Sequence, residues 1–130
     1  MKLHQTRAQG QNLFTGYGPG YVSVNGARWE VSVIVLADQI QRWNVPGFEA
    51  LTEGSFASLA ELRVEIVLLG SGARLRFPHP RLTQALSKAG VGFEVMDTQA
   101  ACRTYNILQD EGRRVAAALL IEPAGQARIA

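Results

Sequence analysis

The sequence predicts a single three-layer α/β domain, in which a central mixed sheet is flanked by helices and an N-terminal β-hairpin ribbon precedes it. Three observations lead to this fold class. Asn25-Gly26 separates two strand-like runs, the segments 66–69 and 115–121 are apolar on both faces, and helical periodicity fills the stretches between the later strands. Because strand and helix alternate there, we expect right-handed crossovers and largely parallel pairing in the second half of the chain.

The N-terminal ribbon is predicted from turn chemistry. Asn and Gly tolerate positive φ at both central positions of a type I′ turn, so we expect a hairpin between 21–24 and 29–36. Its second arm is expected to begin half-exposed at Trp29 and to end fully buried at Leu36. The run 14–20, with three glycines and a proline around two aromatic residues, indicates a tight turn after a short first strand.

After a loop through Trp43 and Pro46, the sequence predicts alternating helices and strands. Apolar residues at i, i+3 and i+4 indicate the helices, with capping residues before them and glycines after them. The expected elements are a helix over 55–62 capped by Ser55, a strand over 64–69, a helix over 80–89 ended by Gly90, a strand over 91–95, a helix over 98–111 capped by Asp97 or Thr98, and a strand over 115–121.

Length and composition restrict the class of protein. The 130 residues, 47% of them hydrophobic, are expected to form one domain, 1–130, with an ordered core over about 12–122. One cysteine excludes an internal disulfide and favours a reducing compartment. No apolar run reaches the ~20 residues of a bilayer span, and a signal peptide is lacking, so we expect a cytoplasmic protein without membrane insertion. A net charge of +2 carries little information about nucleic acid, which we do not expect as a partner.

No catalytic constellation emerges from the residue types. Cys102 lies early in a predicted helix, but the two histidines are His4, in a terminal segment, and His79, in a Pro-flanked loop. A nucleophile needs an orienting base, so we expect Cys102 to be a packing residue. Neither a Ser/His/Asp set, a metal-ligand spacing nor a cofactor motif is present. Glu94 is expected to be partly buried beneath the following helix. We expect it to form an ion pair or a hydrogen bond to a hydroxyl and not to carry out acid/base chemistry, and we assign no role to Glu111.

Gly70-Ser71-Gly72 lies where a phosphate-binding turn would, directly after a buried strand. The dinucleotide fingerprint fails because Leu75 replaces its third glycine, and no Walker ending is present. Arg74, Arg76 and Arg81 follow the turn and leave anion binding open, against the simpler interpretation of a solvated basic loop. Basic residues gather here and again just before the last strand, at Arg113 and Arg114, so any charge-driven function is expected at these two places.

A resemblance to a known family rests on residues 94–113. The residues that carry it are Glu94-Val-Met-Asp-Thr98, Ala101, Thr104-Tyr-Asn106, Leu108 and Glu111-Gly-Arg113. They resemble the small domain-of-unknown-function family that includes mitochondrial respiratory complex I assembly factor three and the adipogenesis-associated domain protein. The likeness extends over 12–122, with Gly70-Ser71-Gly72 in place of the family's Gly-Thr-Gly turn. It implies a three-layer α/β fold and an assembly role with protein partners, and it supplies no catalytic residues. Without an Arg/Ser-rich targeting extension, a bacterial member is expected.

Three functional hypotheses from different classes remain, and the first two share a surface. The first is a non-enzymatic interaction or assembly protein, with respiratory-complex subunits as candidate partners. The second is a small-molecule or anion binder, or an enzyme, that uses the crevice at the carboxyl ends of the strands. Both use one predicted surface, formed by Gly70, Ser71, Gly72, Arg74, Met96, Asp97, Thr98 and Tyr105. A third alternative is nucleic-acid binding through base stacking on Tyr17, Tyr21 and Trp29, which an ordinary hairpin core explains equally well.

Overall fold

The computed structural model describes residues 10–123, and their strands form two sheets. The first is antiparallel and contains β1 (Phe14–Gly18), β2 (Tyr21–Val24) and β3 (Ala27–Trp29). The second contains β4 (Val33–Leu36), β5 (Gln39–Arg42), β6 (Ile66–Gly70), β7 (Gly92–Met96) and β8 (Val115–Leu119), in the spatial order β5-β4-β8-β6-β7. The helical elements are η1 (Phe48–Ala50), α2 (Glu53–Ala60), η2 (Pro80–Thr83), α3 (Gln84–Lys88) and α4 (Thr98–Asp110).

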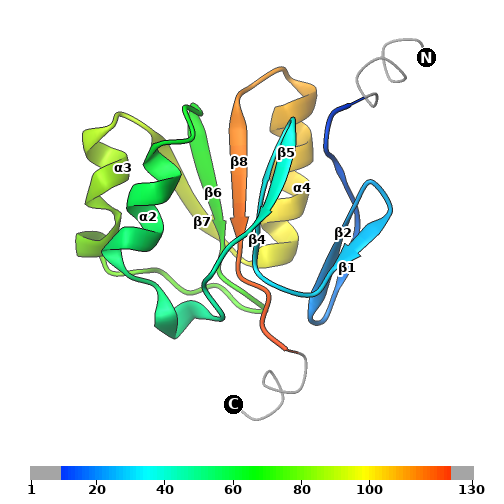
Figure 1. Ribbon diagram of the computed structural model, residues 1–130, viewed down its shortest axis with the longest axis horizontal. Coiled ribbons are helices and arrows are strands. Elements are labelled where there is room, and N and C mark those ends of the chain that lie inside the picture. The colour runs from blue at the N-terminus through cyan, green and yellow to red at the C-terminus, as the bar shows by residue number, and fades with distance from the viewer. Residues whose placement is uncertain (1–9, 124–130) are drawn as a thin grey trace.

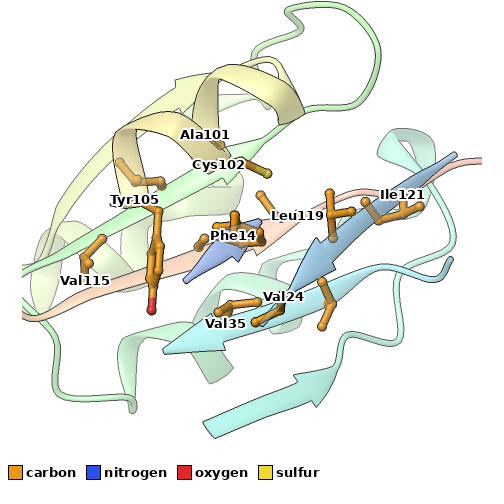
Figure 2. Packing of buried hydrophobic residues seen from close by; sticks show 13 residues of the cluster. Phe14, Val24, Val35, Ala101, Cys102, Tyr105, Val115, Leu119 and Ile121 are labelled. Carbon is orange, nitrogen blue, oxygen red and sulfur yellow. The ribbon is translucent and has the colours of Figure 1, made fainter. Parts of the chain in front are cut away.

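These elements form three layers. Figure 1 shows α2 and α3 on one face of the five-stranded sheet, and α4 with the small sheet on the other. Phe56 and Leu59 of α2 belong to the apolar cluster on the first face. Tyr105 of α4 and Val22 of β2 belong to the cluster on the second face, which Figure 2 shows from close by. The predicted three-layer α/β fold is therefore confirmed.

The central sheet is mixed, as the sequence predicts. β6 pairs in parallel with β7 and β8, while β4 pairs antiparallel with β5 and β8. Val67 and Leu69 face the α2 and α3 layer, and Leu68 faces α4. All five residues of β8 are buried, which explains why its sequence is apolar on both faces.

The hairpin prediction is confirmed at its turn and wrong in the length of its second arm. Asn25 and Gly26 have φ of 52° and 85°, as a type I′ turn requires. The expected strand over 29–36 is instead divided between the two sheets, because the chain leaves β3 and crosses to β4. Buried Ser32 stabilises this crossing: its Oγ accepts from the Ile121 N–H at 3.0 Å, and its carbonyl accepts from the Trp43 N–H at 2.9 Å.

β5 is absent from the sequence prediction, which assigns no element to residues 39–42. Ile40 is the one apolar residue in this strand, and the strand lies at the exposed edge of the sheet, so no alternating pattern marks it. The helix expected over 55–62 is α2, which begins two residues earlier. Thr52 is its N-cap and forms reciprocal hydrogen bonds with Ser55, so Ser55 is the third helical residue and not the cap.

The helix expected over 80–89 is two shorter elements. Pro80 opens a 3₁₀ turn, η2, and His79 caps it by accepting from the Arg81 N–H at 3.0 Å. α3 then ends before Gly90, whose φ of 73° confirms the predicted left-handed stop. Predictions for His4 and for the tail beyond Pro123 fall outside the described residues. None of the helices in residues 10–123 combines the length and apolar composition needed to cross a bilayer.

Candidate functional site

The ends of β6 and β7 meet at the edge of the sheet that the sequence singles out. The Ser71 N–H donates to the Met96 carbonyl at 2.8 Å, and the Thr98 N–H donates to the Gly72 carbonyl at 2.9 Å. In return, the Gly72 N–H donates to Oγ1 of Thr98 at 2.9 Å. The residues predicted to form a crevice are thus close together, but their polar groups bind one another.

The third strand end completes this hydrogen-bonded cluster. Oγ1 of Thr98 donates to the Leu120 carbonyl at 3.1 Å, and the Leu120 N–H donates to the Gly70 carbonyl at 2.9 Å. A Cβ on Gly70 would lie 2.7 Å from a Leu119 methyl and 3.0 Å from the Thr98 Cα, so this position has no room for a side chain. The cluster holds the ends of three strands and leaves no polar group of Thr98 for a ligand.

A cavity of about 400 Å³ lies next to this cluster, between the turn after β1 and the start of α4. Its charged groups are the carboxylates of Asp97 and Glu122. Asp97 caps α4 by accepting from the Ala100 N–H at 2.9 Å. Glu122 accepts from the Arg76 guanidinium at 3.0 Å and from the Phe48 N–H at 3.1 Å. The carboxylates of this cavity are therefore already engaged in structural contacts.

The arginines expected to hold an anion do not converge on the cavity. Arg74 is exposed and lies outside its lining. Arg76 also donates to the Ser71 carbonyl at 2.7 Å, and its guanidinium lies 4.7 Å from the Phe48 ring centroid. This geometry counts against the anion-binding hypothesis at the crevice.

Tyr105 does not belong to the predicted binding surface, because it is fully buried. Its ring packs edge-to-face on Phe14, with centroids 5.2 Å apart, and its hydroxyl donates to the Asn12 carbonyl at 3.1 Å. Next to it, Oδ1 of Asn106 accepts from the Phe14 N–H at 2.9 Å and its Nδ2 donates to the Phe14 carbonyl at 2.8 Å. The Thr-Tyr-Asn segment that carries the family resemblance therefore joins α4 to β1.

Cys102 is a packing residue, as expected from the sequence. Its side chain is fully buried in the cluster between α4 and the central sheet (Figure 2). Burial raises the pKa of the Cys102 thiol to about 12, although the neighbouring Arg103 acts to lower it. The dipole of α4 and Arg103 together do not offset desolvation, so the thiol stays protonated near neutral pH.

The buried thiol predicts how the protein responds to alkali. The unfolded thiol ionises near pH 9, whereas the folded one remains neutral up to about pH 12. The contribution of Cys102 to the free energy of unfolding is thus present below pH 9 and is lost as pH rises toward 12. We expect a Cys102→Ala variant to lose part of this slope in urea titrations. We also expect negligible alkylation of the folded wild type near about pH 8, and rapid alkylation there would contradict the assignment.

The two glutamates left open by the sequence lie outside the crevice. Glu94 is exposed on the edge strand β7, so the expected burial beneath α4 is wrong. Glu111 is the exposed C-cap residue of α4. A carboxylate not singled out by the sequence, Glu65, accepts from Arg113 Nε at 2.9 Å, and this hydrogen bond holds the pKa of Glu65 below its ordinary value. Among residues 10–123, no three His, Cys, Asp or Glu side chains cluster as metal ligands.

Base stacking on the small sheet is not favoured by the contacts of its aromatic residues. The guanidinium of Arg28 lies 3.8 Å from the Tyr21 ring centroid, and that of Arg103 lies 5.9 Å from the Tyr17 centroid. Trp29 packs against the core cluster. These aromatic residues pack within the ribbon and against α4, which agrees with the interpretation as an ordinary hairpin core.

Comparison with known proteins agrees with the sequence motif. Residues 14–120 match the family described as "Protein of unknown function (DUF498/DUF598)". The chain belongs to this family. Bovine NADH dehydrogenase [ubiquinone] 1 alpha subcomplex assembly factor 3 is 39% identical over 110 residues, which are 83% of this chain and 59% of that relative. This chain thus spans about three fifths of the length of this relative, and the resemblance to a family with complex I assembly factors is confirmed.

Bacterial relatives match over nearly their whole length. The crystal structure of a Bordetella parapertussis protein superposes with a TM-score of 0.83 at 39% identity, covering 88% of this chain and 99% of that one. A 13 kDa major membrane protein of Francisella tularensis is 24% identical over 122 residues, covering 92% of this chain and 99% of that relative. The region similar to this chain therefore covers nearly the full length of both bacterial relatives.

Proposed function

We propose that this protein is a non-enzymatic, assembly-factor-like domain that binds an acidic protein surface through the loop 73–81. The observation that carries the proposal is that two large apolar side chains on this loop, Leu75 and Phe77, are 52% and 68% exposed. Large apolar side chains that remain exposed on a folded surface are typical of protein-interaction sites.

The loop is held in one conformation by its polar groups. Oγ of Ser71 donates to the Arg74 carbonyl at 2.8 Å and accepts from the Arg76 N–H at 3.0 Å. The Arg76 side chain is fixed by Glu122, and Phe77 precedes buried Pro78, which favours extended backbone. Leu75 and Phe77 therefore flank an anchored residue. Because the loop is ordered before binding, little conformational entropy is lost when a partner covers it.

The charge around the loop specifies the partner's chemistry. Arg74 and Arg81 of this loop are exposed, and no Asp or Glu occurs in the sequence between Glu65 and Glu94. Basic groups around an apolar contact favour a partner whose apolar pocket has an acidic rim.

The comparisons support a partner from a respiratory complex. The bovine relative is named as an assembly factor of NADH dehydrogenase, and it is 39% identical to this chain. We propose a respiratory-complex subunit or assembly intermediate as the partner, and a location in the bacterial cytosol. A membrane-bound complex as partner is also compatible with the name of the Francisella relative.

A photo-cross-linking experiment tests this surface. We expect a benzoyl-phenylalanine placed at position 77 to give a reproducible protein adduct in native cells, because a bound partner covers this side chain. The matched control is the same group at Ile107, which is 58% exposed on α4. The adduct at position 77 should disappear at high salt, since the partner's rim is acidic. Equal adducts at both positions, or none at 77, would contradict the proposal.

A further inference from the structure

A second cavity, of about 670 Å³, lies at the edge of the central sheet opposite to the loop 73–81. It is formed where α4 ends, where β8 begins and where the turn between β4 and β5 lies, and these segments are neighbours in Figure 1. Its apolar walls include Leu36, Leu62, Val64 and Val115. Its volume falls in the range of small-molecule sites.

Two hydrogen-bond acceptors in the interior of this cavity have no donor partner among the described residues. Gln109 lines it and is 6% exposed, and its buried Oε1 accepts no hydrogen bond. Oε1 of Gln11, which also lines the cavity, is buried and unpartnered in the same way. Buried amide oxygens are almost always paired in folded proteins. Two such oxygens in one cavity indicate a ligand that donates hydrogen bonds.

The rim of the cavity carries three exposed guanidinium groups, those of Arg63, Arg113 and Arg114. Arg113 and Arg114 share a single carboxylate, Glu65, at 2.9 and 3.6 Å. Arg63 has a φ of 60°, a left-handed conformation that is uncommon for a residue other than glycine. This side of the rim suits an anion.

Two aspartates restrict how an anion binds there. Asp38 and Asp110 also line the cavity and would repel a negative group on their side. We therefore expect the anionic end of a ligand to lie beside the arginines. The end that carries hydrogen-bond donors would lie beside Gln109 and Gln11. The Asp38 carboxylate can also accept a hydrogen bond from an uncharged donor group of the ligand.

We propose that this cavity binds a mononucleotide. The amino group of the base, and in guanine also the ring N–H, donates to Oε1 of Gln109 or Gln11, the apolar walls contact the faces of the ring, and the phosphate binds at Arg63 and Arg113. The site has none of the sequence motifs of nucleotide-binding folds and lies apart from the proposed docking loop, so it stands independently of the proposed function.

Titration of the isotope-labelled full chain with AMP and GMP, followed by NMR, tests this proposal. We expect saturable shifts at 36–38, 62–65 and 109–115 for at least one nucleotide, with affinity about tenfold higher than for adenosine, guanosine or inorganic phosphate. Gln109→Leu should weaken nucleotide binding about tenfold, whereas Gln84→Leu, at an exposed glutamine of α3, should leave it unchanged.

A second variant separates ligand binding from folding. Arg63→Gly removes a rim guanidinium, and glycine readily adopts the left-handed backbone at this position. The variant should bind the nucleotide about tenfold more weakly and the nucleoside with unchanged affinity. No saturable shift by about 10 mM of either nucleotide would overturn the proposal. So would inorganic phosphate binding as tightly as the nucleotides, or nucleotide affinities that neither Gln109→Leu nor Arg63→Gly changes.

Discussion

Thr98→Val is expected to lower the free energy of unfolding by about 2–4 kcal/mol. Thr98 is 8% exposed, and its hydroxyl joins two chain segments by accepting from the Gly72 N–H and donating to the Leu120 carbonyl. Valine has nearly the same shape but no hydroxyl, so both backbone groups would stay buried without partners. Urea unfolding, followed by circular dichroism, measures the change.

The matched control for this variant is Thr98→Ser, which keeps the hydroxyl and removes one methyl. We expect a loss of about 1 kcal/mol for this change, because only apolar contacts are removed. If the valine and serine variants lost equal amounts of stability, the hydroxyl would not join the ends of the strands as described here.

Replacing both Leu75 and Phe77 by serine is expected to weaken partner binding by about a hundredfold or more, because exposed apolar anchors dominate interface energies. The variant should fold normally, since both side chains are largely exposed and the loop is held by Ser71 and Arg76. Isothermal titration with the partner identified by cross-linking at position 77 gives the affinities.

The control for this prediction is Ile107→Ser, which removes an apolar side chain of comparable exposure from α4. It should leave the affinity within about a factor of two, because α4 lies outside the proposed surface. A double variant at Leu75 and Phe77 that bound as tightly as wild type would remove the loop from the interface.

The elements predicted well from the sequence are those set by local chemistry. Asn25-Gly26 specifies its turn by backbone preference alone, and the apolar runs of β6 and β8 require burial on both faces. The meeting of Gly70 with Thr98 follows from parallel pairing, which places carboxyl ends of strands at one edge of the sheet.

The features that sequence reasoning missed depend on distant partners. The division of the strand expected over 29–36 depends on Ser32, whose partner Ile121 lies 89 residues away. Tyr105 is part of the binding surface predicted from the sequence, yet its hydroxyl donates to the Asn12 carbonyl inside the fold. Gln109 resembles a surface residue in sequence, and only the packing of α4 buries it.

One missed signal was present in the sequence itself. Leu75 and Phe77 are apolar residues in a segment whose prolines and arginines indicate a loop. Side chains in such a loop are not expected to be buried in the hydrophobic core. Apolar side chains alternating with basic ones outside any helix or strand indicate a contact surface more directly than the glycine turn before them.

An NMR map of the bound partner's footprint on the isotope-labelled protein tests the docking loop most directly. We expect the bound partner, obtained by cross-linking at position 77, to perturb amide signals of 73–81 most strongly, and added salt to weaken these changes. Signals from 107–115, at the opposite edge of the sheet, should not move. A footprint centred on 107–115 or on the small sheet, with 73–81 unperturbed, would show that this loop is not the docking surface.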